Sequence, residues 1–371
     1  MKPWRYHHQA RSFSMCLSIV FHYHLRNQTM LNDSLEKLIA ASARIGSNLD
    51  LVQAGGGNTS IKEDGTLWVK ASGKWLSRAN EDDMFLPVPM ADIERQLAAE
   101  DEKFPEYRTR TGESLRPSVE TAVHAVMPQK VVIHVHSVRT IAWAARAGGR
   151  EGVQSLLAGL KCSWIPYTHP GIPLAIKIRE EMPARPDVLI LENHGLVVAA
   201  EDCEGAEQFL AEVERRLSGE TRSAPAVNLQ RLEELSHGSE WEIAADQEAH
   251  ALGGDARSCE VAAQGTLFPD QCVYLGPAAA VVGPTDTLDA AAQRYQSSHK
   301  FAPVFLLVPG AGVLTRRGMN KAARELLLCL KRVIERIPAD AKATYLPTHQ
   351  VARLMNWDAE KYRIAMARKE T

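Results

Sequence analysis

The chain has 371 residues, of which 45% are hydrophobic and 24% are charged, and its formal net charge is −2. This composition is ordinary for a globular protein with one large or two smaller domains. The lack of a basic stripe argues against nucleic acid or an anionic membrane as the main partner. The cysteines follow no CxxC spacing, which argues against a zinc ribbon or a thioredoxin-like motif.

The N-terminal segment, residues 1–29, contains a short apolar run that histidines interrupt, and we expect a flexible tail rather than a signal peptide. No apolar stretch is long enough to cross a bilayer, so we expect no transmembrane helix and a cytoplasmic location. From residue 34 the apolar positions recur at helical spacing, which predicts a helix that ends at Gly46.

Three consecutive glycines, Gly55 to Gly57, indicate tightly bent backbone after this helix. Residues 91–116 are charged and are expected at the surface, and Pro117 predicts a helix start because proline favours the first helical turn. The remaining predictions for this half are strands at 66–71, 131–136, 187–191 and 196–200, and helices at 140–147, 155–160 and 202–217.

A polar stretch at 218–227 predicts a linker, and a second α/β pattern follows it. We therefore predict a tail at 1–29, a catalytic domain at 30–220, a helical linker region at 221–261 and a smaller C-terminal α/β unit at 262–371. The segments that begin at Leu191 and Leu307 both join an apolar strand to a second strand and a helix. They suggest an internal repeat, although any strand-turn-strand-helix unit has this pattern.

The strand at 131–136 carries two histidines, His134 and His136, which share a face because side chains alternate along a strand. Paired imidazoles repel when charged and leave unpaired nitrogens when neutral, and a divalent metal resolves both problems. His194, in a polar turn between two apolar strands, is a third candidate ligand. Three histidines with an open position are typical of a catalytic zinc. The alternative is a set of buried histidines bonded to backbone carbonyls.

Glu120 is the candidate acid/base, because a carboxylate beside a divalent cation can either ligate it or exchange protons with substrate. The alternative is a first-turn glutamate that stabilises a helix N-terminus. His124 lies four residues later on the same helix face, where it either orients the carboxylate or is an ordinary core histidine.

A second group of residues combines small polar side chains with the exposed backbone N–H groups of turns and helix starts. Phosphate favours such positions, although each one alone is an ordinary turn. Neither a Walker motif nor a GxGxxG fingerprint is present, so a nucleotide P-loop is not supported. The candidate phosphate-binding residues are Asn58, Thr59, Ser72, Gly73 and Ser118.

Taken in order, these motifs resemble the class II aldolase/adducin superfamily, which includes fuculose-phosphate and rhamnulose-phosphate aldolases and ribulose-phosphate 4-epimerase. The later segments Leu267–Asp270 and Trp357–Tyr362 are similar to the aldolase part of rhamnulose-phosphate aldolase/dehydrogenase fusions. The matching motifs are Gly57–Ser60, Lys70–Gly73, Pro117–Glu120, His134–His136, Tyr167–Ala175 and Asn193–Leu196.

The resemblance implies a three-layer α/β/α fold with a mixed, mostly antiparallel central sheet. It implies a divalent metal, in the first instance Zn²⁺, on His134, His136 and His194, with Glu120 as acid/base. The implied reaction cleaves a ketose phosphate to dihydroxyacetone phosphate and an aldehyde through a metal-stabilised enediolate. The resemblance also implies a sugar-phosphate substrate, a homo-oligomer, and phosphate contacts at Asn58, Ser72, Gly73 and Ser118. Tyr167 and His169 are candidates for a second proton transfer.

Two departures from the family pattern affect these expectations. Val119 stands where the family's aldolases often have a second serine, which weakens the phosphate assignment. Fewer residues separate Glu120 from His134 than in the small fuculose-phosphate enzymes, and this affects the direction in which the Glu120 side chain is expected to point. Competing functions are an epimerase or dehydratase on the same scaffold, a component that works with a separate dehydrogenase, and a non-catalytic adducin-like module. The last predicts loss of the three histidines, which are all present.

Overall fold

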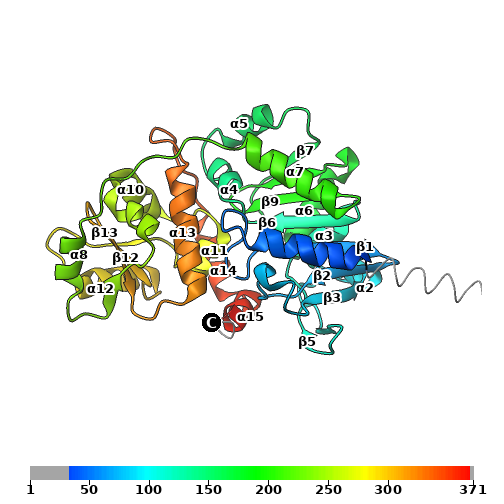
Figure 1. The fold of residues 1–371 in the computed structure, drawn as a ribbon, viewed down its shortest axis with the longest axis horizontal. Coiled ribbons are helices and arrows are strands. Elements are labelled where there is room, and N and C mark those ends of the chain that lie inside the picture. The colour runs from blue at the N-terminus through cyan, green and yellow to red at the C-terminus, as the bar shows by residue number, and fades with distance from the viewer. Residues whose placement is uncertain (1–32, 368–371) are drawn as a thin grey trace, which may run out of the picture.

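The computed structural model describes residues 33–367, so the tail expected at 1–29 lies outside it. Figure 1 shows two α/β units, with the larger one built from the N-terminal half of the chain. Its sheet has seven strands, and all neighbours are antiparallel except the parallel pair β7 and β8. In spatial order the strands are β3 (Phe85–Pro89), β2 (Thr66–Lys70), β1 (Asn58–Glu63), β6 (Val131–Val135), β9 (Gly195–Ala200), β8 (Val188–Leu191) and β7 (Cys162–Ile165).

Helices cover both faces of this sheet, which confirms the expected three layers with a mostly antiparallel centre. One face packs against the helix at 33–46, α4 (Val138–Ala144), α5 (Gly149–Leu156) and α7 (Cys203–Arg216). The other packs against α2 (Met90–Ala99), α3 (Thr121–Val126) and α6 (Ile172–Glu181). In β6, Ile133 and Val132 point into opposite layers, which explains why this strand reads as a continuous apolar run.

The helix predicted at Pro117 begins later, at Thr121. Residues 116–118 are extended because they continue the pairing of β2: Ser72 N donates to Arg116 O and Ser118 N donates to Lys70 O. The segment at 91–116, expected only as charged surface, contains most of α2 and a small hairpin. Its strands are β4 (Tyr107–Arg108) and β5 (Ser114–Leu115).

The second sheet has the order β10 (Trp241–Ile243), β13 (Gly312–Arg316), β12 (Phe305–Val308) and β11 (Ala280–Val281). The boundary expected at residue 262 is therefore too late, because Trp241 is fully buried and its strand pairs with β13. The helices of this half are α8 (Leu229–Ser236), α9 (Ala251–Gly254), α10 (Ala256–Gln264), α11 (Pro269–Tyr274), α12 (Leu288–His299), α13 (Lys321–Glu335), α14 (Thr348–Asn356) and α15 (Asp358–Ala367). Short 3₁₀ turns occur in both units: the first contains η1 (Leu76–Arg78) and η2 (Met182–Ala184), and the second contains η3 (Gln247–His250).

The two sheets share a topology, which supports the internal repeat suggested by the sequence. The strands β6-β9-β8-β7 and β10-β13-β12-β11 have the same order and the same pattern of parallel and antiparallel pairs. At the third residue of β9, Val197 pairs with His134, whereas at the third residue of β13, Leu314 pairs with Ile243. The second copy thus keeps the scaffold but replaces this histidine with an aliphatic side chain.

The two units share one apolar core, which includes Ile141 of α4, Phe268 beside α11, Leu330 of α13 and Leu354 of α14. Figure 1 shows α13 between the units, with α11, α14 and α15 beside the edge of the larger one. This arrangement brings the C-terminal helices to the ends of β6 and β9. Within the described part of the chain, every helix is too short or too polar to traverse a bilayer.

Candidate active site

Three histidine rings converge where β6 and β9 lie side by side. His134 belongs to β6, His136 follows the end of that strand, and His194 lies in the turn that precedes β9. The antiparallel pairing of Val135 with Leu196 brings the two chain segments together. The ring centroids are 5.0 to 5.3 Å apart. Residues far apart in sequence thus form one cluster, as the sequence predicted.

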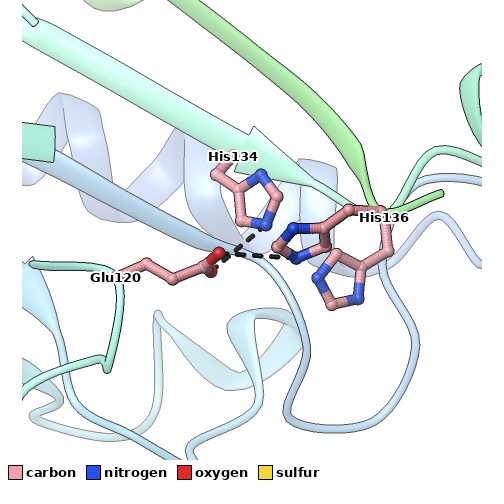
Figure 2. A group of neighbouring side chains, drawn as sticks. Glu120, His134 and His136 are labelled. Carbon is pink, nitrogen blue, oxygen red and sulfur yellow. Dashed lines mark ion pairs between the residues drawn. The ribbon is translucent and has the colours of Figure 1, made fainter. Parts of the chain in front are cut away.

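Glu120 lies against this cluster from the N-terminus of α3. Its Oε2 is 3.2 Å from His134 Nε2, and its Oε1 is 3.4 Å from His194 Nε2. Figure 2 shows the Glu120 carboxylate pointing toward the rings, with its ion pairs as dashed lines. Burial opposes ionisation, but the neighbouring ring of His134 holds the pKa of Glu120 well below its usual range. The carboxylate is therefore an anion at neutral pH.

These four side chains fit a divalent cation. One ligand atom from each lies within 4.8 Å of the others, and all four residues are buried. Several of their polar atoms, including Glu120 Oε1 and His194 Nδ1, have no hydrogen-bond partner, which is costly unless another group engages them. Burial lowers the pKa of His194 to about 3, so its ring is neutral, the form that binds metal. Three imidazole nitrogens and a carboxylate oxygen form a donor set suited to zinc.

The sheet fixes the orientation of the first histidine. His134 Nδ1 lies 3.0 Å from Leu196 O on the neighbouring strand. Because a carbonyl only accepts hydrogen bonds, Nδ1 carries a proton, and Nε2, which lies 3.2 Å from Glu120 Oε2, is the nitrogen that a cation can use. The ring is thus held in the orientation that a metal ligand needs.

A buried hydrogen-bond chain supports Glu120 from the side of β1. Asn58 Nδ2 donates to Glu120 Oε2 at 2.9 Å, and Asn58 Oδ1 contacts His124 Nε2. His124 Nδ1 in turn lies 2.7 Å from Ser60 Oγ. Burial lowers the pKa of His124 to about 3, which keeps this ring neutral. Of the two readings of His124, the structure favours the one in which it acts on Glu120, through Asn58.

Two expected phosphate contacts need correction. Both ends of the Asn58 amide are occupied, by Glu120 and His124. Thr59 is fully buried, and its Oγ1 lies 2.7 Å from Ser42 Oγ in the helix at 33–46. The physical reason is strand alternation, because β1 begins at Asn58 and sends the next side chain to the opposite face. The Thr59 hydroxyl therefore faces away from the histidine cluster.

The other three phosphate candidates form a small cradle beside Glu120. Ser72 and Ser118 are nearly buried, and Ser118 Oγ accepts the Glu120 N–H at 3.2 Å. Gly73 has φ +79°, and a Cβ added there would lie 2.6 Å from Met366 Cβ in α15. The C-terminal helix thus packs directly on the cradle.

A cavity of about 680 Å³ adjoins this cradle. Ser72 and Val119 line one side, while Trp357 and Tyr362, from the segment around α15, line the other. Arg116 stacks over the Tyr362 ring, with its guanidinium carbon 4.7 Å from the ring centroid. The cavity therefore lies between the larger unit and the C-terminal helices.

Tyr167 and His169 lie on the side of the C-terminal helices. The Tyr167 ring packs against the core that the two units share, its hydroxyl has no hydrogen-bond partner, and burial raises its pKa. The His169 ring lies 4.7 Å from that of Trp357, and neither of its nitrogens has a hydrogen-bond partner. Burial lowers the pKa of His169 to about 4. Their part in proton transfer stays a prediction.

Sequence reasoning gave no role to two residues that contact the site, Asp270 of α11 and Arg363 of α15. Asp270 Oδ2 lies 2.9 Å from His136 Nδ1, and Arg363 Nη2 donates to Asp270 Oδ1. Burial opposes the ionisation of Asp270, but Arg363 and His136 hold its pKa below the usual range. The one available signal was the segment Leu267–Asp270, which ends in an aspartate at a helix start.

Comparisons with known proteins agree on the first unit. The family model described as "Class II Aldolase and Adducin N-terminal domain" matches residues 36–218. "Uncharacterized oxidoreductase YuxG" of Bacillus subtilis is 30% identical over an alignment of 191 residues, which covers 47% of this chain and 27% of that protein. "Methylthioribulose-1-phosphate dehydratase" of Microcystis aeruginosa is 29% identical over an alignment of 197 residues, which covers 47% of this chain and 89% of that protein. The match thus spans about a quarter of the Bacillus protein.

Solved structures also match this half of the chain. The N-terminal class II aldolase domain of a conserved protein from Thermoplasma acidophilum has 26% identity and a TM-score of 0.42, over 49% of this chain and 90% of that one. L-fuculose-1-phosphate aldolase from Thermus thermophilus has 22% identity and a TM-score of 0.34, over 49% of this chain and 92% of that one.

Proposed function

Because residues 36–218 belong to the class II aldolase and adducin superfamily, we propose that this protein is a metal-dependent aldolase. It would cleave a ketose phosphate to dihydroxyacetone phosphate and an aldehyde. The observation that carries the proposal is the buried cluster of Glu120, His134, His136 and His194, whose ligand atoms lie within 4.8 Å of one another. A divalent cation on these residues, Zn²⁺ in our proposal, would supply Lewis acidity toward the oxygens of the ketose.

Glu120 is the proposed acid/base. Its carboxylate is ionised at neutral pH, so it can accept a proton. Asn58 holds Oε2, whereas Oε1 has no hydrogen-bond partner and is the oxygen that can reach a substrate proton. In cleavage, Glu120 would therefore pass to the carbon next to the carbonyl a proton that the substrate hydroxyl has released, while its other oxygen keeps the side chain in place.

The proposed phosphate site consists of the Ser72 and Ser118 hydroxyls and the backbone of Gly73. Ser72 lines the cavity, which would hold part of the sugar, and Ser118 Oγ accepts the Glu120 N–H. Since Met366 lies over Gly73, substrate entry requires α15 to shift. We further propose that the protein is a homo-oligomer, and this proposal rests on family membership alone. Analytical ultracentrifugation measures the number of chains per particle directly.

A dehydratase is the second candidate. It is favoured by the match to methylthioribulose-1-phosphate dehydratase, which covers 89% of that protein. Both reactions place negative charge on oxygens next to the breaking bond, so the same ligand set serves either one. The two differ in which bond breaks: the aldolase breaks a carbon–carbon bond, and the dehydratase expels a hydroxyl.

One assay separates the two candidates. Purified protein loaded with Zn²⁺ is incubated with a panel of ketose 1-phosphates, and products are followed by mass spectrometry and by a coupled assay for dihydroxyacetone phosphate. Release of dihydroxyacetone phosphate supports the aldolase. Loss of one water from an intact carbon skeleton supports the dehydratase. Metal-loaded protein that leaves the whole panel unchanged contradicts both.

A further inference from the structure

A carboxylate from the second unit faces the candidate metal ligands of the first. Asp270, in the first turn of α11, is 1% exposed. Its Oδ2 lies 2.9 Å from His136 Nδ1, and neither atom has a hydrogen-bond partner elsewhere. The loop before β1 packs against this pair, because a Cβ added at Gly56 would lie 2.9 Å from His136 Nδ1 and 3.1 Å from Asp270 Oδ2. Solvent is thus kept away from the contact.

The other oxygen of Asp270 accepts a hydrogen bond from the guanidinium group of an arginine. Arg363 of α15 donates from Nη2 to Asp270 Oδ1, and its Nε donates to Glu360 Oε2 at 2.8 Å. A guanidinium only donates hydrogen bonds, so the atom that it contacts must be an acceptor. Arg363 therefore fixes which oxygen of Asp270 faces His136.

We propose that Asp270 is a positioning residue for the metal centre, which accepts a hydrogen bond from His136 Nδ1–H and so leaves the Nε2 lone pair for the cation. Leu196 O has the same relation to His134, at 3.0 Å from Nδ1. Fixing the tautomer in this way typically improves metal affinity by about 10- to 100-fold. The second unit, whose own sheet lacks the histidines, thereby completes the site of the first. This inference rests on the metal site of the proposed function.

The test uses the fact that Arg363 accepts only a hydrogen-bond acceptor at the Oδ1 position of residue 270. In Asp270→Asn the side-chain shape is kept, and Arg363 requires the amide oxygen to stay at the Oδ1 position. The amide NH₂ then faces His136 and donates to Nδ1, which moves the ring proton to Nε2 and blocks the ligand atom. Asp270→Ala removes the acceptor but leaves the ring free to adopt either tautomer. Asparagine is therefore expected to weaken metal binding more than alanine does.

A purely structural role predicts the opposite order, because asparagine keeps the bond to Arg363 whereas alanine leaves a cavity and a buried unpaired cation. The readouts are Zn²⁺ affinity, from competition with a chromogenic chelator, and the melting temperature of the metal-free protein. We expect Asp270→Ala to bind Zn²⁺ about 10- to 100-fold more weakly than the unaltered protein, and Asp270→Asn more weakly still. The metal-free Asp270→Asn protein should melt at or above the temperature of Asp270→Ala.

A matched control is available on the neighbouring helix. Asp255 caps α10 and accepts from Arg222 Nη2 at 3.0 Å, so it is another arginine-paired aspartate at a helix start. Asp255→Asn is expected to bind Zn²⁺ as the unaltered protein does. The inference is overturned if Asp270→Asn binds Zn²⁺ as tightly as the unaltered protein or more tightly than Asp270→Ala. If Asp270→Ala does not fold, the Zn²⁺ affinity of Asp270→Asn relative to that of the unaltered protein is sufficient to test the inference.

These affinities are measured without substrate, so they are separate from the proposed reaction. Weakened binding in Asp270→Asn supports the inference even if no ketose phosphate is turned over. Turnover by the unaltered protein together with tight binding in Asp270→Asn leaves the proposed function standing and removes Asp270 from the metal centre.

Discussion

Asn58 Nδ2 donates a 2.9 Å hydrogen bond to Glu120 Oε2, and this bond ties strand β1 to the proposed acid/base. His124 contacts the other end of the same amide and fixes which way it points. An amide held at both ends keeps the carboxylate in one orientation. The residue expected to bind phosphate is thus better described as the support of Glu120.

The support role predicts different effects for two adjacent residues. Asn58→Ala is expected to lower kcat about tenfold, with metal content unchanged, because Glu120 loses the bond that orients it. Thr59→Val is expected to leave kcat and KM within about twofold and to cost about 1 kcal/mol of stability, through loss of the Ser42 contact. Steady-state kinetics and denaturant unfolding measure both. A large rise of KM in Thr59→Val would instead restore Thr59 to the phosphate site.

Removing the charge of Glu120 separates acid/base chemistry from metal binding. Glu120→Gln is expected to retain the metal, since the three histidines remain, and to lose more than about a hundredfold in kcat. Metal analysis and turnover are measured on the same preparation. Unchanged turnover would remove Glu120 from the mechanism.

The packing of α15 on the phosphate cradle predicts a position-specific loss of stability. Gly73 and Gly112 both have left-handed backbone, with φ +79° and +91°, but a Cβ at Gly112 would have no atom within 4 Å. Gly112→Ala should cost about 1–2 kcal/mol, for the backbone alone. Gly73→Ala should cost about 1–3 kcal/mol more, because the new Cβ overlaps Met366 Cβ. Equal losses in denaturant unfolding would mean that α15 does not rest on the cradle in solution.

The buried neutral His124 predicts a pH-dependent variant effect in metal-free protein. The folded pKa of this ring is about 3, so below about pH 6.5 the unfolded chain binds a proton that the folded protein does not. Folding stability from this group is therefore lost at about 1.4 kcal/mol per pH unit as the pH falls. His124→Gln lacks this loss, so its destabilisation should shrink by about 2 kcal/mol between pH 7.5 and pH 5. Denaturant unfolding at both pH values tests this, with the exposed His237→Gln as control. A constant difference would contradict the neutral ring.

Part of this site was visible in the sequence because its signals are local. The alternation within Val131–His136 predicted a strand with two histidines on one face, and the polar turn at His194 followed a second apolar strand. What no local pattern contains is the strand register, in which Val135 pairs with Leu196 and brings the rings together. The resemblance to a family supplied that step.

Other features depend on contacts between distant segments. Asp270 and Arg363 reach the site only because the two units share a core, and neither lies in a periodic pattern that would mark it. The second sheet was placed too late because β10 has three residues, too few for an alternating signal. Thr59 was misjudged because a strand start after three glycines looks like a turn.

The central claim is that His134, His136 and His194 bind one divalent ion beside Glu120, and metal analysis of His134→Ala tests it most directly. A suitable control is His250→Ala, since His250 is equally buried but lies in the second unit, where Nδ1 accepts from Val313 N. After dialysis against Zn²⁺ and then against metal-free buffer, the unaltered protein and His250→Ala should retain about one ion per chain, and His134→Ala essentially none. Stoichiometric zinc in His134→Ala would contradict the account.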